Sequence, residues 1–232
     1  MRKGDWTILI IVIISGICYY YFSSPNNSGL QEVNIQRIID GDTLEIENNI
    51  KLRLKGINTP EENEPYSKQA TAFLQKLENK TVLLENHGTD KYNRILAYIF
   101  HNKESVNEQI VSLGLAHVYY YETDKHYESL KKAESIAREK GLGIWKKSNK
   151  SSCLKLISLN YKEETRCTNQ EQLILQNNCN NIPVKIKDDA THIYEEELKT
   201  GITTLNFSCI FNNEGDSLYV YDSSGLLIFY RY

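Results

Sequence analysis

The sequence predicts an α+β protein, in which a five-stranded barrel with three helices is preceded by a membrane helix and followed by a small all-β sandwich. Between residues 33 and 148, stretches of alternating apolar and polar residues are mixed with stretches of helical period. From residue 153 onward, only short strand-like runs remain, separated by Asn, Gly and Asp. A long uncharged run near the N-terminus adds the membrane helix.

The N-terminal segment, residues 1–22, is predicted to be a membrane anchor. Residues 6–22 carry no charge, and their length is at the lower edge of the roughly 17 to 25 residues that span a bilayer as a helix. Arg2 and Lys3 precede the run, which places the following residues outside the cell by the positive-inside rule. A cleavable signal peptide is the alternative, but no small-x-small cleavage pattern follows. Residues 23–32 are a polar linker.

The strands of the barrel are predicted from alternation. Residues 33–39, 43–47 and 50–57 form a meander with a turn at "ENN", and "TVLLENHG" and "RILAYIF" return to the strand pattern later. A helical face, residues 66–77, separates the third strand from the fourth. This is the element order of an OB-type barrel, a fold that often binds nucleic acid.

Two further helices follow the strands. Ser105 and Glu108 have the spacing of a capping box, and Gly114 ends the helix that they begin. The last helix covers about residues 126–140 and ends at Gly141.

Charged residues crowd the stretch "IIDGDTLEIENNIKLRLKGINTPEE", residues 38–62, although it otherwise has the pattern of a sheet. Solvated charges near a turn are the simplest explanation. The alternative is a divalent-metal site that faces a phosphate, because hard cations prefer carboxylate and carbonyl oxygens and arginine can bind phosphate through two parallel hydrogen bonds.

Residues 33–148 resemble the staphylococcal nuclease (thermonuclease) family through five blocks in family order and spacing. The blocks are "IDGDT", "LRLKGINTPE", "TDKYNRILAYIF", "VNEQIVSLGLAHVYYY" and "EKGLGIW". The resemblance implies a calcium-dependent enzyme that hydrolyses DNA and RNA phosphodiesters and leaves 3′-phosphates.

The resemblance also assigns roles to particular residues. Asp42 corresponds to an aspartate that ligates calcium, and Thr59 to a threonine that offers its backbone carbonyl. Glu61 corresponds to the glutamate that orients or deprotonates the attacking water. Arg53 and Arg94 correspond to the two arginines at the scissile phosphate.

One position departs from the family pattern at the metal. The family commonly has aspartate before Thr-Pro-Glu as a second calcium ligand, and this chain has Asn58. An amide carbonyl can still coordinate calcium, but the site loses a negative charge, so we expect weaker binding unless Asp40, Glu62 or Glu64 compensates.

The substrate contacts implied by the resemblance are Lys91, Tyr92 and Tyr120, where an ammonium can meet phosphate and a phenol ring can stack on the nucleotide. A second family tyrosine is replaced by Glu122. The five histidines show no metal-ligand spacing, so we expect surface or packing roles for them.

The four cysteines after residue 150 are predicted to form two disulfides in an oxidising compartment, with the pairing open. Zinc is the alternative, although none of the spacings is Cys-x-x-Cys. These cysteines are Cys153, Cys167, Cys179 and Cys209.

Residues 153–232 are predicted to form an immunoglobulin-like sandwich. The runs "EQLILQNNC" and "FNNEGDSLYVYDSSGLLIFYRY" resemble the lamin-tail domain, which implies interaction or positioning through a ligand that the sequence does not identify. The chain has a net charge of −3, and the acidic excess falls in this region, which argues against a second surface for nucleic acid.

We therefore expect a calcium-dependent, extracytoplasmic nuclease of DNA, RNA or both, held at the membrane by its N-terminal segment. An inactive OB-fold module that binds nucleic acid at the cell surface is the alternative. Asn58 is the only sequence feature in favour of that alternative.

Overall fold

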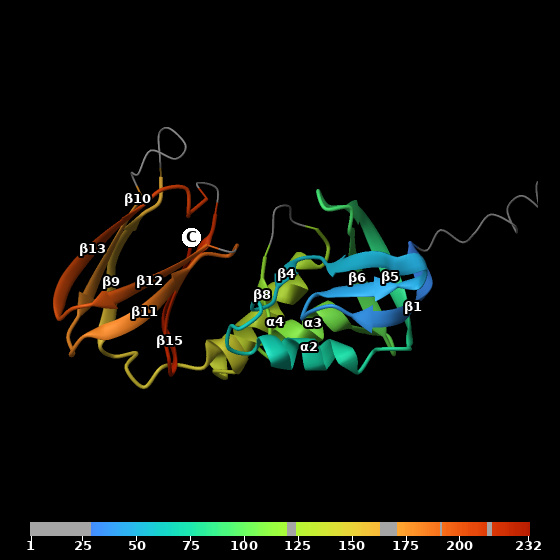
Figure 1. Cartoon of the computed structure of the whole chain (residues 1–232), viewed down its shortest axis with the longest axis horizontal. Coiled ribbons are helices and arrows are strands. Elements are labelled where there is room, and N and C mark those ends of the chain that lie inside the picture. The colour runs from blue at the N-terminus through green and yellow to red at the C-terminus, as the bar shows by residue number, and fades with distance from the viewer. Residues whose placement is uncertain (1–28, 120–123, 163–170, 191, 213–214) are drawn as a thin grey trace, which may run out of the picture.

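The structure is a computed structural model that describes residues 29–119, 124–162, 171–190, 192–212 and 215–232 (Figure 1). A barrel with helices packed beside it and a pair of β-sheets follow each other along the long axis of the chain (Figure 1). The predicted membrane segment, residues 1–22, lies outside the described residues. Among the residues that are described, no helix is long and apolar enough to cross a membrane.

The predicted five-stranded barrel is confirmed. Its strands follow the order β3-β2-β1-β5-β6, and the barrel closes because β3 also pairs with β6 in parallel, with Arg53 opposite Leu96. Side chains alternate between a buried and an outer face, as Leu52 and Leu54 show on either side of Arg53. The strands are β1 (Leu30–Ile38), β2 (Thr43–Ile46), β3 (Ile50–Leu54), β5 (Thr81–Thr89) and β6 (Ile95–His101).

Three helices pack against the barrel, as expected. They are α2 (Ser67–Gln75), α3 (Val106–Ser112) and α4 (Tyr127–Glu139). The capping box is present in part, because Ser105 Oγ accepts a hydrogen bond from the backbone N–H of Glu108 at 3.2 Å. Leu74, Ile110 and Leu130 from the three helices join the barrel residues in one buried cluster.

The predicted third strand, residues 50–57, is wrong at its end. Strand β3 stops at Leu54, the chain turns at Gly56, whose φ is 78°, and a short strand β4 (Ile57–Asn58) pairs instead with β8 (His117–Val118). A positive φ strongly favours glycine, so Gly56 is the residue that allows this turn. Its effect is to bring Asn58 and the loop that follows it to one rim of the barrel. The remaining short elements of the barrel are η1 (Glu47–Asn49) and β7 (Glu104–Ser105).

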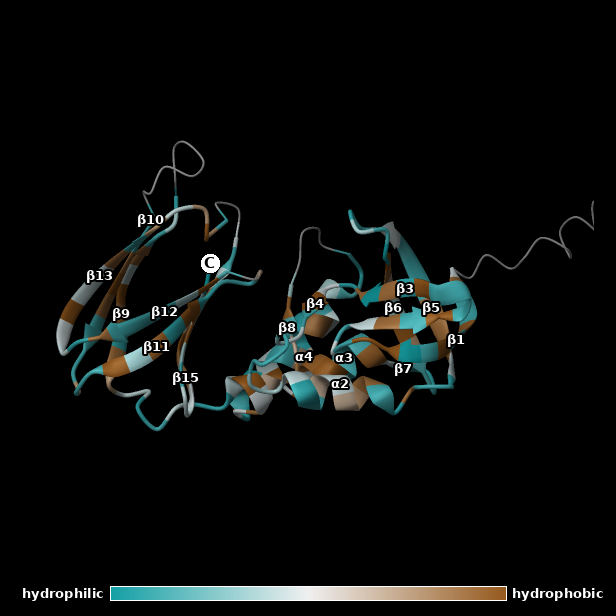
Figure 2. Cartoon of the chain, in the orientation of Figure 1, coloured by the Kyte–Doolittle hydropathy of each residue, from teal (hydrophilic) through white to brown (hydrophobic). Residues whose placement is uncertain are grey.

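The C-terminal region forms two antiparallel sheets, of order β13-β10-β9 and β12-β11-β14-β15. Apolar residues of both sheets form one buried cluster, and hydrophobic and hydrophilic residues alternate along the strands (Figure 2). The acidic β12 lacks a pronounced strand pattern, and its pairing to β11 places it. The strands are β9 (Leu154–Asn160), β10 (Glu171–Asn177), β11 (Ile182–Lys187), β12 (Ile193–Leu198), β13 (Gly201–Phe207), β14 (Ser217–Asp222) and β15 (Gly225–Arg231).

The two regions share an apolar junction. Trp145 in the 3-10 turn η2 (Gly143–Trp145) is 1% exposed and clusters with Tyr219 and Leu226 of the C-terminal sheet. The chain just after η2 also pairs with that sheet, since Leu226 N–H donates to Lys146 O at 2.8 Å and Ser148 N–H donates to Leu226 O at 2.9 Å. The regions are therefore packed on one another.

The disulfide prediction is supported by the structure. Cys153 and Cys179 are bonded to each other, and Cys209 is also disulfide-bonded, so the zinc alternative is wrong for these three cysteines. Cys167 lies outside the described residues.

Candidate active site

One cleft of about 1400 Å³ collects every predicted site residue within the described part of the chain, while Tyr120 lies outside that part. The cleft is formed by the β1–β2 turn, the outer face of β3, the loop after β4 and the loop between β5 and β6. Its lining includes Asp42, Arg53, Asn58, Thr59, Glu61, Lys91, Tyr92 and Arg94.

Asp42 holds two walls of this cleft together. Its Oδ2 accepts hydrogen bonds from the backbone N–H and the Oγ1 of Thr59, each at 3.0 Å. The same oxygen lies 3.0 Å from Arg53 Nη2. Gly41 permits this approach, because a Cβ there would lie 2.7 Å from Thr59 Oγ1 and also 2.7 Å from Ala70 Cβ. The glycine of "IDGDT" is therefore required by close packing of the loop.

Three carboxyl groups crowd this end of the cleft. Burial raises the pKa of Asp40, and the charge of Asp42 raises it further. Burial and then the charge of Asp42 also raise the pKa of Glu61, against an opposing effect from Lys187. Asp40 Oδ1 is fixed by the backbone N–H groups of Asp42 and Thr43, at 2.9 and 2.7 Å. Mutual repulsion among these carboxylates would be relieved by a cation.

The donor set at this end fits calcium. Asp40, Asp42 and Glu61 supply carboxylate oxygens, and Thr59 supplies a carbonyl. Hard divalent cations with flexible coordination prefer oxygen ligands of this kind. The residues present therefore match the cofactor that the sequence predicts.

The Asn58 side chain is hydrogen-bonded to protein groups at both its oxygen and its nitrogen. Its Oδ1 accepts a hydrogen bond from Arg53 Nη2, and its Nδ2 donates to the backbone O of Asp189 at 2.8 Å. Arg53 also donates to Leu54 O. The carboxamide thus connects the cleft to the C-terminal region, and Oδ1 would have to be shared with Arg53 to reach an ion.

Arg94 is positioned by the loop "TDKYNR". Asp90 Oδ2 accepts from Arg94 Nε at 2.7 Å, and Asp90 Oδ1 accepts from the backbone N–H groups of Arg94 and Tyr92, each at 2.9 Å. Burial acts to raise the pKa of Asp90, but these hydrogen bonds lower it overall, so the carboxylate stays charged. Asn93, with φ of 62°, allows the tight turn. Arg94 Nη1 then reaches 3.4 Å from Thr43 Oγ1 inside the cleft.

Tyr92 is an exposed aromatic ring between two cations. Its side chain is 68% exposed, with Lys91 Nζ at 5.1 Å and Arg94 Cζ at 5.4 Å from the ring centroid. An exposed ring beside positive charge is the combination that holds an unstacked base and its phosphate. The structure thus brings together the three predicted substrate and phosphate groups of this loop.

Sequence reasoning missed the contribution of the C-terminal region to the cleft. Lys187 Nζ lies 3.0 Å from Glu64 Oε2, and the two side chains are 9% and 10% exposed. Glu64 Oε2 in turn accepts from the backbone N–H of Glu61 at 2.8 Å. With the Asn58–Asp189 hydrogen bond, these contacts fix both ends of the loop 58–64. No local signal could have found them, because the partners are more than a hundred residues apart.

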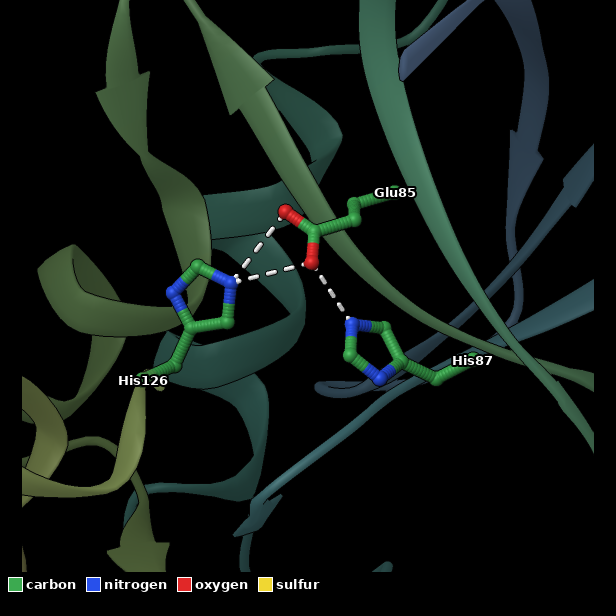
Figure 3. A group of neighbouring side chains, drawn as sticks. All are labelled: Glu85, His87 and His126. Carbon is green, nitrogen blue, oxygen red and sulfur yellow. Dashed lines mark hydrogen bonds and ion pairs between the residues drawn. The ribbon is translucent and has the colours of Figure 1, made fainter. Parts of the chain in front are cut away.

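Two of the histidines belong to a group of side chains that spacing along the sequence did not indicate. His87 lines the cleft, and with Glu85 and His126 it forms a compact group on one side of the barrel (Figure 3). Only the closing of the barrel against α4 brings these residues together.

Comparisons with known proteins agree with this geometry. The family model described as "Staphylococcal nuclease homologue" matches residues 51–147. The chain is 33% identical over 167 residues to the thermonuclease of Staphylococcus hyicus, covering 62% of this chain and 99% of the relative. It is 34% identical over 153 residues to the thermonuclease of Staphylococcus intermedius, with 60% and 90% covered. Endonuclease YncB of Bacillus subtilis is 34% identical over 140 residues, with 54% and 66% covered.

Proposed function

Because this chain belongs to the staphylococcal nuclease family, it is a nuclease, and we propose that it hydrolyses phosphodiesters of DNA, RNA or both with calcium as cofactor and leaves 3′-phosphates. The observation that carries the proposal is the convergence of Asp42, Arg53, Glu61 and Arg94 on one cleft. A phosphodiester repels an incoming hydroxyl group, so catalysis requires positive charge at the phosphate and a group that takes the proton of water.

The two arginines supply the positive charge. Arg94 is held through Nε by Asp90, and its Nη1 reaches Thr43 inside the cleft. Arg53 lines the same cleft, with its orientation fixed by Asp42 and Asn58. Guanidinium groups on both sides of a phosphate stabilise the extra charge of a five-coordinate phosphorus, and their orientation before substrate arrives removes the need for reorganisation.

Glu61 is the proposed general base. Its backbone is fixed by Glu64, and its exposed side chain lines the cleft. The raised pKa brings the carboxylate closer to the basicity that proton abstraction from water requires. Glu61 would accept the proton as the water oxygen forms its bond to phosphorus, and the leaving 5′-oxygen would then take a proton from solvent.

Asp42, Asn58 and Thr59 are the proposed calcium ligands. Bound calcium would supply positive charge beside the phosphate and lower the pKa of water. The oxygen donors of Asp42 and Thr59, and the pKa shifts of the carboxyl groups around them, support this assignment. Asn58 is supported less directly, since its Oδ1 already accepts from Arg53.

Lys91, Tyr92 and Tyr120 are the proposed substrate-binding residues. Tyr92 and Lys91 suit a single strand or an unpaired segment, because a base can stack on the exposed ring only after it has left a duplex. Tyr120 follows Tyr119, which lines the cleft, and this proximity in sequence supports its assignment.

We also propose an extracytoplasmic location with membrane attachment through residues 1–22. The uncharged run at residues 6–22 and the Cys153–Cys179 disulfide support it, since disulfides persist in oxidising compartments. The C-terminal sheets, with their resemblance to the lamin-tail domain, are proposed to bind a further partner whose chemistry is open.

The test is cleavage of single-stranded DNA and RNA by the purified chain in calcium or in EGTA, with analysis of product ends. Activity should require calcium and yield 3′-phosphates. Glu61→Gln and Arg94→Ala should each lower turnover about 10² to 10⁴-fold. Arg37→Ala is the matched control, because its side chain is 63% exposed on β1 and lies outside the cleft. Binding without cleavage in calcium would favour the inactive module instead.

A further inference from the structure

Glu85, His87 and His126 form a cluster that the proposed reaction does not use. Glu85 and His87 stand two residues apart on β5, and His126 precedes α4. In Figure 3 the two imidazole rings approach the Glu85 carboxylate from different sides. The cluster therefore joins a strand of the barrel to the start of a helix.

The ligand atoms are close to one another. His87 Nε2 lies 2.8 Å from Glu85 Oε1, and His126 Nε2 lies 3.2 Å from Glu85 Oε2. One atom from each of the three residues can be chosen so that all lie within 4.8 Å of one another. Zinc needs N and O ligands at about 2.0 to 2.2 Å, so small side-chain rotations would place all three around one ion.

We propose that Glu85, His87 and His126 form a binding site for a zinc-class transition-metal ion, separate from the calcium site. Two imidazoles and one carboxylate are a ligand set that suits zinc and its neighbours, whereas calcium prefers oxygen alone. Three protein ligands leave one position of a tetrahedral ion for water or another small ligand.

The surroundings of the cluster can hold the ligands in place. Tyr98, which is buried, packs against the His126 ring at an interplanar angle of 38°, with the ring centroids 3.9 Å apart, and lies edge-on to His87 at 5.1 Å. Asp124 Oδ2 accepts from Tyr98 OH at 3.1 Å and lies 3.9 Å from His87 Nδ1. With a small movement, Asp124 would come within hydrogen-bond distance of His87 Nδ1, where a carboxylate holds the tautomer that leaves Nε2 available for metal.

Two lysines would have to adjust when an ion binds. Lys125 Nζ lies 2.9 Å from Glu85 Oε1, but its side chain is 68% exposed and can move into solvent. Lys55 Nζ lies 3.2 Å from His87 Nδ1 and also 3.1 Å from Asp124 Oδ2. An ammonium group only donates, so His87 Nδ1 accepts from Lys55 in this arrangement and Nε2 carries the ring proton. When an ion binds Nε2 the proton must shift to Nδ1, and Lys55 must then move away from His87 while it keeps its bond to Asp124. Neither lysine therefore blocks the site.

An ion can reach the cluster from solvent. The three ligand side chains are 13% to 20% exposed, and His87 and Lys55 line the active-site cleft. The site is thus accessible but largely enclosed, as expected where an ion exchanges through an open face.

The test is calorimetric titration of the purified full chain with zinc chloride in excess calcium, which keeps the oxygen site filled. Cobalt(II) serves as an optical probe, because its visible absorption becomes intense in tetrahedral coordination. We expect the parent to bind one zinc ion while calcium is present. The dissociation constant for zinc should be at least tenfold higher in each of Glu85→Gln, His87→Gln and His126→Gln. His101→Gln is the matched control, since this histidine, at the end of β6, is not part of the cluster.

Thermal unfolding in EDTA would verify that each variant is folded. If one variant does not fold, the other two still test the proposal. Zinc binding that persists in two folded ligand variants, or that weakens equally in His101→Gln, would overturn the proposal. So would zinc that excess calcium displaces, because the ion would then occupy the calcium site. A hydrogen-bond network without metal affinity would show no binding at all.

Discussion

Arg53 and Asp42 form an ion pair of 3.0 Å between Nη2 and Oδ2, and their side chains are only 12% and 11% exposed. Each charge is therefore largely removed from water and depends on the other. In this position Arg53 compensates for the carboxylates in the absence of an ion, besides its proposed role at phosphate.

Replacing Arg53 should reveal this compensation in the metal dependence of stability. Arg53→Met should lower the free energy of unfolding in EGTA by about 3 to 5 kcal/mol, because a nearly buried carboxylate loses its partner. Saturating calcium should recover part of the loss by supplying positive charge beside Asp42. Chemical denaturation in both conditions measures the two effects. Arg37→Met, whose pair with Glu45 is at the surface, should change stability by about 1 kcal/mol or less in either condition.

Replacing Asn58 by aspartate should strengthen calcium binding. Asn58→Asp adds a negative charge at a proposed ligand, so the calcium concentration for half-maximal cleavage should fall, about tenfold for each 1.4 kcal/mol gained. Stability in EGTA should fall, because the Nδ2 donor to Asp189 O is lost and a further carboxylate joins the crowded site. Asn58→Ala is the control, and it should not lower the calcium requirement. A requirement that stays constant or rises in Asn58→Asp would show that this side chain does not reach the metal.

Asp189 should make folding stability depend on pH above its ordinary titration range. Burial raises its pKa to about 6, although Arg231 and the hydroxyl of Tyr219 oppose the shift. The unfolded chain holds the ordinary value of about 3.9, so the charged carboxylate destabilises the fold above pH 6, and the destabilisation is relieved as pH falls from 6 to 4.

The measurement is urea unfolding at pH 7 and pH 5, in EGTA so that calcium does not contribute. On going from pH 7 to pH 5, the free energy of unfolding should change more favourably in the parent than in Asp189→Asn, by about 1 kcal/mol, because only the parent carries the Asp189 carboxyl. The comparison with the variant is needed because His117 acts in the opposite direction. Burial lowers the pKa of His117 to about 3, so between pH 7 and pH 5 only the unfolded chain takes up a proton there, and both proteins lose stability from it. An identical pH dependence in parent and variant would contradict the raised pKa.

The disulfides should stabilise the C-terminal region and have little direct effect on chemistry. Reduction, or Cys153→Ser with Cys179→Ser, should lower the stability of that region by about 2 to 5 kcal/mol. Residues 33–148 contain no cysteine, so cleavage measured well below the unfolding transition should persist. Non-reducing peptide mapping should find Cys153 joined to Cys179, and we predict Cys167 joined to Cys209. Free thiols at these positions in protein from its native compartment would contradict both pairings and the proposed location.

Sequence periodicity was sufficient for the barrel because each strand has one buried face and each helix one apolar stripe. The Leu52 and Leu54 side chains follow this rule directly. The cleft was predicted for a different reason, since the quoted motifs carry the loop geometry with them, including Gly41 and Asn93. Strands β9, β11 and β12 were not predicted; β12 in particular carries three glutamates, which leave little apolar signal.

Long-range polar contacts could not be predicted. The Asn58–Asp189 and Glu64–Lys187 contacts each join residues more than a hundred positions apart, and nothing in either local pattern specifies the other. The histidine cluster was lost for the same reason, because spacing along the chain says nothing about His126 lying beside β5.

The packing of Gly225 against Lys146 has a consequence for how the protein can be divided. A Cβ at Gly225 would lie 2.3 Å from Lys146 O, so the turn between β14 and β15 packs against the segment after η2 too closely for any side chain at this position. A fragment ended at residue 148 would uncover Trp145 and take from Glu134 its partner Arg231, whose Nη2 lies 3.2 Å from Glu134 Oε1. We therefore expect a fragment that ends at residue 148 to be less stable than the same region in the full chain, and we expect the two halves of the full chain to melt in a single transition.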